Sequence, residues 1–254
     1  MPDYNLKETQ TMEYKRPDVV KGYTDQTLYI NLADPQIEIK PVDEKTKKTF
    51  IGGKGYDLWL LWNAVQPSTR WNDPENALCI AAGPLGGTPI YPGSGKSIVA
   101  TLSPTTGSVM DSNVGGYFGP YLKFSGFDAL EIQGKSSKEI VVFIDGINQK
   151  VQVFEASGLP ENAYELSAIL TEHFAQGKPR NISVVSAGPV AKNTLIGCLN
   201  FTRYDPKRKR ARYKQAGRGG VGSVFADKGL KAVVACWGNV TADTNAPADK
   251  DRLK

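Results

Sequence analysis

The sequence predicts an α+β fold in which short strands outnumber a few helices. Apolar or alternating segments of strand length recur along the chain, whereas helical spacing of apolar residues is clearest in two segments, 50–65 and 161–176. Two of the apolar segments, 79–84 and 184–189, end in the same tripeptide, Ala-Gly-Pro. The repeated tripeptide indicates a duplicated structural unit, with chance repetition as the alternative.

The composition is that of an ordinary globular protein. Of 254 residues, 40% are hydrophobic and 22% are charged, which suits one large domain or two small ones. The 26 glycines and 16 prolines follow no period, so they exclude a collagen-like chain and indicate many turns. We expect three parts: a polar N-terminal arm at 1–22, a domain at 23–238 and a C-terminal tail at 239–254.

Several classes of protein are excluded by what the sequence lacks. It has no stretch of about 18 apolar residues and no signal-peptide core, so we expect a cytoplasmic protein without a membrane span. The three cysteines lie far apart, with no Cys-x-x-Cys pair, and the chain has one histidine. By itself, the chain therefore cannot supply four cysteines to a zinc or iron–sulfur site.

The first half of the chain predicts a hairpin, a helix and further strands. Residues 27–32 and 36–42 alternate apolar and polar positions around Ala-Asp-Pro, which predicts a β-hairpin. A glycine-rich segment then precedes apolar residues at helical spacing, so 56–65 is expected to be a buried helix. Strands are expected next at 77–83 and 97–103.

The second half predicts one clear helix among several strands. The helix covers 161–176 and ends before a Gly-Lys-Pro sequence. The glycines near 217–222 are expected to lead into a further, short helix. Strands are expected at 129–134, 139–146, 150–156, 181–188 and in the last part of 216–236.

A Gly-Ser-Gly-Lys-Ser sequence at 93–97 is similar to part of a P-loop. A Walker A motif needs a glycine four residues ahead of its Gly-Lys-Ser, where this chain has Ile90, and it leads into a helix. Because the segment here enters a strand instead, an ATPase is disfavoured. Two interpretations stay open: a plain hairpin turn, or a turn that offers N–H groups and Lys96 to a phosphate.

Two later segments combine glycines with other informative residues. Residues 217–222 have the Gly-x-Gly-x-x-Gly spacing, but the basic run ARYKQ precedes them where a dinucleotide-binding motif needs a strand, and its later acid is absent. Their bare backbone, with Lys214 and Arg218 beside it, favours a phosphate ligand at a helix start. Residues 113–120, which include Gly115, mix glycines with aromatic residues, so tight β-packing and a flat ring lying on the backbone both fit.

The positive charge of the protein is concentrated in one segment. Residues 203–218 contain eight basic residues and one acid, a local charge of +7, so the remainder of the chain carries −2. Such a segment can neutralise nucleic-acid phosphates, dock on an acidic partner or form a solvated loop. Nucleic acid is disfavoured because only Tyr204 and Tyr213 are interleaved with the basic residues.

Taken in order, six motifs resemble one family. They are FIGGKG (50–55), AAGPLGGTP (81–89), SGKSIVATLSPTTG (94–107), DSNVGGYFGPYLKFSGFDALEIQGK (111–135), VVSAGP (184–189) and AGRGGVGSVFADKGLKAVV (216–234). Together they resemble the N-terminal domain of the tungsten-containing aldehyde:ferredoxin oxidoreductases over about residues 24–238. The catalytic subunits of benzoyl-CoA reductases belong to the same family and match about as well.

The resemblance implies a β-rich base domain of two similar halves beneath a tungsten or molybdenum bis-pterin cofactor. It also implies a Mg²⁺ ion that bridges the pterin phosphates and is held through backbone carbonyls. By motif, the magnesium positions fall on Asn113 and Gln215, and the other cofactor-binding positions fall on Lys96, Gly115, Lys214, Gly217 and Arg218. Lys96 and Lys214 stand where better-known members have arginine. No catalytic residue is implied in this chain.

The activity that the resemblance implies is oxidation of an aldehyde to a carboxylic acid, with electrons passing through a [4Fe–4S] cluster to ferredoxin or another carrier. An aromatic acyl-CoA reductase of the benzoyl-CoA type is the alternative. Family members hold the cluster in helical domains that follow the base domain, and this sequence ends before them. We therefore expect a split subunit or a fragment, inactive without a second polypeptide that carries those domains.

Overall fold

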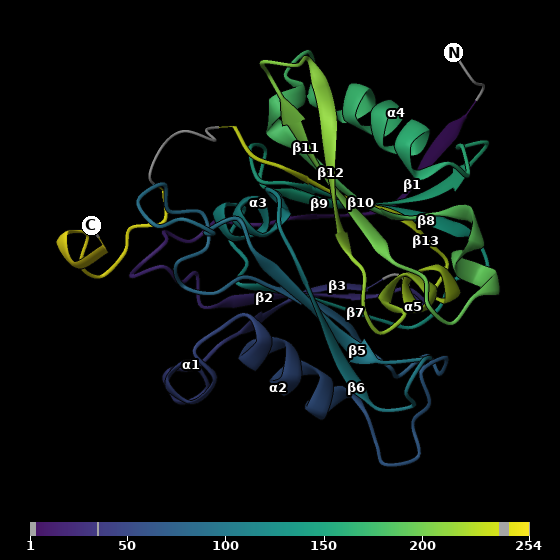
Figure 1. The fold of residues 1–254 in the computed structure, drawn as a ribbon, viewed down its shortest axis with the longest axis horizontal. Helices are drawn as coiled ribbons and strands as arrows, with labels where there is room; N and C mark the ends of the chain where they lie inside the picture. Colours follow the sequence, from purple (N-terminus) through teal and green to yellow (C-terminus); the bar gives the residue numbers. More distant parts are fainter. Residues whose placement is uncertain (1–3, 35, 239–243, 254) are drawn as a thin grey trace.

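The computed structural model describes residues 4–34, 36–238 and 244–253, and its strands form two mixed sheets (Figure 1). The six-stranded sheet, in the order β3-β2-β7-β4-β5-β6, contains β2 (Gln26–Asn31), β3 (Gln36–Pro41), β4 (Leu78–Ala81), β5 (Ser97–Leu102), β6 (Val109–Val114) and β7 (Ala129–Gln133). The seven-stranded sheet, in the order β1-β9-β8-β13-β10-β11-β12, contains β1 (Asn5–Glu13), β8 (Glu139–Asp145), β9 (Lys150–Ser157), β10 (Ile182–Ala187), β11 (Leu199–Asp205), β12 (Arg210–Ala216) and β13 (Leu230–Cys236). The predicted β-rich α+β fold is confirmed.

The helices lie on the outer faces of the two sheets and in the core between them (Figure 1). The α-helices are α1 (Glu44–Phe50), α2 (Lys54–Ala64), α3 (Phe118–Phe124), α4 (Ala163–Ala175) and α5 (Val221–Asp227). Of these, α1, α2 and α4 lie on the outer faces, whereas α3 and α5 pack in the shared core. In Figure 1, α4 covers the seven-stranded sheet from one side, and α1 and α2 lie beyond the six-stranded sheet on the other. Within the described ranges, no helix is long and apolar enough to cross a membrane.

The core is continuous between the sheets and extends beneath the outer helices. Neighbouring residues on the central strand β10 show the division: Val185 faces the shared core, whereas Val184 packs in the cluster that contains Leu166 and Leu170 of α4. A strand covered on both faces has no reason to alternate apolar with polar residues. This explains the unbroken apolar runs of the central strands in the sequence.

The two sheets contain two copies of the same arrangement. Each copy has two antiparallel strands, a helix, three strands in a meander, a short helix and a last strand parallel to the first. The elements in order are β2, β3, α2, β4, β5, β6, α3, β7 in one half and β8, β9, α4, β10, β11, β12, α5, β13 in the other. The Ala-Gly-Pro tripeptides follow β4 and β10, which are equivalent strands. The predicted duplication is confirmed.

The two ends of the chain differ from what their composition predicts. Within the segment expected to be a polar arm, 1–22, β1 pairs along its length with β9 at an edge of the seven-stranded sheet. In the expected tail, Asn245 is fully buried, and its side-chain amide donates to the carbonyls of Pro84 and Gly86, both at 2.8 Å. Residues 239–243 and 254 of the tail, and 1–3 of the arm, lie outside the described residues.

Candidate cofactor site where the two sheets meet

The candidate site lies where the edge strands β6 and β12 pass one another in opposite directions. The backbone N–H of Arg218 donates to Ser112 Oγ at 3.0 Å. A Cβ added to Gly219 would lie 2.8 Å from Met110 Cβ, and one added to Gly115 would lie 3.8 Å from Lys214 Cγ. These contacts bring together two glycine-rich loops that are about a hundred residues apart in the sequence.

The two predicted magnesium positions are equivalent in the two halves. Asn113 pairs with Ile98 in the β5–β6 hairpin, and Gln215 pairs with Asn200 in the β11–β12 hairpin. Each lies one residue before the end of an edge strand, and a glycine, Gly115 or Gly217, follows two residues later. The duplication therefore places two copies of one loop against each other.

The glycines of these loops divide into two groups. Gly116, with φ +127°, and Gly219 and Gly220, each with φ +66°, adopt backbone conformations that other residues rarely adopt. Gly115 and Gly217 have no such φ, and a Cβ added to Gly217 would have no neighbour within 4 Å. The fold therefore does not require glycine at 217, and the bare backbone there fits the close approach of a bound group.

Three cations surround the bare backbone. Lys96, Lys214 and Arg218 are exposed. The turn before Lys96 packs on the first loop, because a Cβ added to Gly95 would clash with the carbonyl of Gly116. All seven residues predicted from the sequence thus lie around one surface. Exposed cations beside bare N–H and C=O groups suit a ligand that carries phosphates, so the residues present fit the implied cofactor.

The side chain of Gln215 is already engaged in the sheet. Its Nε2 donates to Asn200 Oδ1 at 3.2 Å, on the face of β12 opposite to Lys214. On the face of Lys214, Gln215 therefore offers only its main chain. This agrees with the expected role of a backbone carbonyl as the magnesium ligand.

Sequence reasoning missed the side chains that position these loops. Ser112 joins the two loops from within β6, and the Arg203 guanidinium carbon lies 5.7 Å from the centre of the Tyr117 ring. Ser112 stands in the motif 111–135 and Arg203 in the basic segment 203–218, but neither pattern assigns these side chains a positioning role. Only the pairing of β6 with β5 and of β12 with β11 could have placed them at the site.

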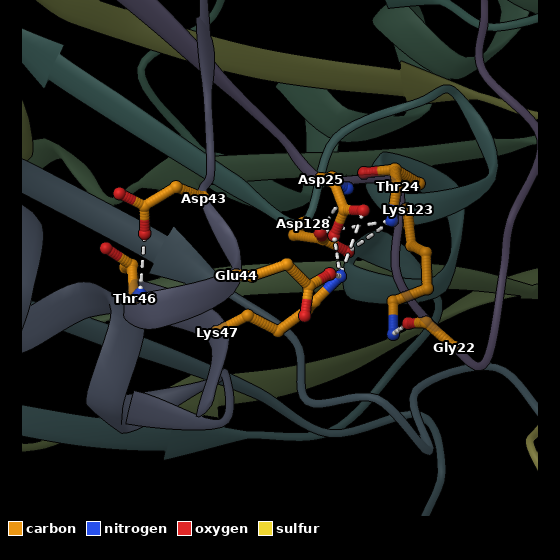
Figure 2. A network of polar contacts seen from close by, with 9 residues as sticks. All are labelled: Gly22, Thr24, Asp25, Asp43, Glu44, Thr46, Lys47, Lys123 and Asp128. Atoms are coloured by element: carbon orange, nitrogen blue, oxygen red, sulfur yellow. Dashed lines mark hydrogen bonds and ion pairs between the residues drawn. The ribbon is translucent and has the colours of Figure 1, made fainter. Parts of the chain in front are cut away.

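A buried lysine, Lys123, fixes the loop that follows β4. Lys123 Nζ donates to the carbonyl of Gly22 at 2.7 Å (Figure 2). It also donates to the carbonyl of Gly83, within the first Ala-Gly-Pro. Nearby, the Asp128 carboxylate accepts from the backbone N–H of Thr24 at 3.1 Å. Burial lowers the pKa of Lys123 to about 8, although Asp128 favours the charged form. Two loops far apart in the sequence therefore share one ammonium group.

This lysine predicts a pH dependence of stability. Its pKa is about 8 in the folded protein and near 10.5 when exposed, so between these values the unfolded chain binds more protons. We compare the free energy of unfolding of the native protein with that of the Lys123→Met variant. The difference, native minus variant, should rise by roughly 1 kcal/mol per pH unit above pH 8. Urea unfolding between pH 7 and about 9.5 measures it.

A second buried lysine provides an independent test of the same effect. Lys228 has a pKa of about 8, again through burial, and Lys228→Met should show the same sign of pH dependence. A flat difference for both variants would show that the lysines are charged in the fold throughout this range, which would contradict the prediction.

The comparisons with known proteins establish the family. Residues 27–236 match the family described as aldehyde ferredoxin oxidoreductase, N-terminal domain. Because this match covers most of the chain, the chain belongs to that family, and the resemblance found in the sequence is confirmed.

Relatives and a solved structure agree with this assignment. The tungsten-containing aldehyde ferredoxin oxidoreductase of Pyrococcus furiosus is 35% identical over 205 residues, 80% of this chain and 32% of that protein. An aliphatic sulfonate oxidoreductase, WOR-like subunit, of the same organism is 29% identical over 220 residues, 84% of this chain and 34% of that protein. The active site complex BamBC of benzoyl coenzyme A reductase, solved with 1,5-dienoyl-CoA, matches with a TM-score of 0.75 at 32% identity, over 85% of this chain and 31% of that chain.

The chain spans about a third of the length of these relatives. The shared part is the two-sheet domain with the paired loops, so family membership applies to this domain.

Proposed function

We propose that this chain is the cofactor-binding base of a tungsten or molybdenum bis-pterin oxidoreductase. The observation that carries the proposal is the meeting of two equivalent loops, each with a bare glycine, Gly115 or Gly217, among exposed cations. The names of the relatives support tungsten, because several are described as tungsten-containing enzymes.

The residues of this chain bind and orient the cofactor. Lys96, Lys214 and Arg218 would pair with phosphate oxygens of the cofactor, and the backbone of Gly115 and Gly217 would allow it to lie close. The main-chain carbonyls of Asn113 and Gln215 would hold a Mg²⁺ ion, because carbonyl oxygens suit this hard cation. The bound group supplies two-electron redox chemistry.

The reaction we propose is oxidation of an aldehyde to a carboxylic acid in the cytoplasm. A second polypeptide supplies the helical domains and a [4Fe–4S] cluster, through which electrons pass to ferredoxin or another carrier. The names of the curated aldehyde ferredoxin oxidoreductases support this reaction. The second candidate, reduction of an aromatic acyl-CoA, is supported by the likeness to the benzoyl-CoA reductase complex.

The proposal is tested by the metal content of the protein as isolated from its native source. We expect tungsten or molybdenum near one atom per chain, together with iron and a co-purifying second polypeptide. Activity with an aldehyde and a viologen dye, compared with reduction of benzoyl-CoA, then separates the two reactions. Protein that keeps its partner chain but carries neither metal would refute the cofactor assignment.

A further inference from the structure

A groove separates α4 from the β11–β12 hairpin, on the face of β12 opposite to Lys214. It encloses about 760 Å³, and its walls include Ala168 of α4 and Ala211 of β12. At one end, the rings of Tyr164 and Tyr213 meet edge to face, with centroids 4.3 Å apart. Figure 1 shows the hairpin standing beside α4. The groove therefore has small side chains along its walls and a closed aromatic end.

The hairpin wall of the groove is strongly cationic. Lys209 lies in the hairpin turn, and Arg210 and Arg212 border the groove from β12, although they alternate onto the face of Lys214 while Ala211 and Tyr213 face the groove. The only acid in the basic segment 203–218 is Asp205, and its carboxylate already contacts Arg208 at 2.9 Å and Arg212 at 3.6 Å. Among the described residues, no carboxylate forms an ion pair with Lys209 or Arg210. Much of the local positive charge is therefore available to a bound partner.

The opposite wall of the groove carries negative charge, and the difference in charge between the two walls selects the kind of partner. Glu172 of α4 lines the groove across from the basic hairpin. A polynucleotide carries negative charge along its whole backbone, so it would meet this carboxylate unfavourably. The rings of Tyr164 and Tyr213 also contact each other, which limits their use as stacking platforms for bases. A protein segment can instead present acids to one wall and neutral side chains to the other.

We propose that this groove docks an acidic segment of a partner protein. Carboxylates of the segment contact Lys209, Arg210 and the neighbouring Lys207, and its small side chains lie along Ala168. Charge complementarity supplies the attraction and fixes the orientation, while the groove supplies the shape. The proposal does not depend on the cofactor, because none of the seven proposed cofactor-binding residues lines the groove.

Fluorescence anisotropy with a labelled alternating Glu-Ala peptide tests the groove directly. The variant Lys207→Gln/Lys209→Gln/Arg210→Gln should weaken binding by about tenfold or more at low salt. The matched control Lys7→Gln/Lys45→Gln/Lys48→Gln removes the same charge from other exposed lysines and should leave binding nearly unchanged. Ala168→Trp fills the groove without changing charge and should also abolish binding, because Ala168 is an exposed helix residue whose replacement the fold tolerates.

Three outcomes would overturn the proposal. The first is equal weakening by the control variant. The second is unchanged peptide binding by the Ala168→Trp variant at an unaltered melting temperature. That result would show that the peptide binds through nonspecific charge attraction and not in the groove. The third is tighter binding of an oligo-dT strand than of the peptide, with the same sensitivity to both groove variants, which would make the groove a polynucleotide site.

The same contact can be tested in the complex purified from native cells. A carbodiimide joins an amine directly to a carboxylate, so it should link Lys207 or Lys209 to an Asp or Glu of the partner chain. Links to the partner that arise only from lysines elsewhere on this chain would contradict the proposal, whatever the metal content of the complex.

Discussion

Replacing Gly222 by alanine is expected to destabilise the protein by about 3 kcal/mol, although alanine is normally the better helix former. A Cβ at this position of α5 would lie 2.5 Å from the carbonyl carbon of Cys198 and closer still to its oxygen. Both partners are backbone, and Gly222 itself is buried, so neither α5 nor the start of β11 can give way locally. Urea unfolding monitored by circular dichroism measures the loss.

The equivalent glycine in the other half, Gly119, is expected to lose less stability when it is replaced by alanine. A Cβ on Gly119 of α3 would clash with the Ser97 hydroxyl, whereas the carbonyl of Lys96 would stay 3.4 Å away. Because the clash is with a side chain, Gly119→Ala should cost about 1–2 kcal/mol, and adding Ser97→Ala should restore most of it. Gly188→Ala has open space around the new Cβ and should be nearly neutral. Equal losses at 119, 188 and 222 would contradict this explanation.

Strands with unbroken apolar runs could be predicted from the sequence, whereas three of the four edge strands, β1, β6 and β12, could not. Strands such as β8 and β13 are buried on both faces, so their apolar runs are visible without knowledge of their neighbours. β1 and β6 lie at sheet edges, and most of their residues are partly or fully exposed. Their polar sequences therefore carry little hydrophobic pattern, and backbone pairing with β9 and β5 defines them instead.

The members of the candidate site could be predicted, but their geometry could not. The glycine-rich motifs identified Gly115, Gly217 and the nearby cations because short sequence patterns contain them. Their proximity depends on β6 and β12 both being edge strands, which is a property of the whole sheet order. The burial of Lys123 could not be predicted from the sequence, because hydropathy places a lysine at the surface. Its partners in the fold are carbonyls from two loops that are distant in the sequence.

Replacing Gly217 by valine is expected to remove tungsten or molybdenum from the isolated complex while leaving the fold intact. An added Cβ would find no neighbour within 4 Å in this chain, and Gly217 does not have the positive φ that favours glycine. The added methyl groups would instead occupy the space where we propose that the pterin lies. Gly217→Ala should lose less metal than Gly217→Val, because the smaller group intrudes less.

The measurement compares the metal content and the melting temperature of tagged variants isolated from the native host. Gly238→Val is the matched control, since Gly238 is also exposed and an added Cβ would make only ordinary contact with Ile147, at 3.5 Å. It should retain its metal. Full metal content in Gly217→Val would place the cofactor elsewhere. Loss of metal together with a large fall in melting temperature would instead show that this loop needs glycine for its own fold, against the geometry described above.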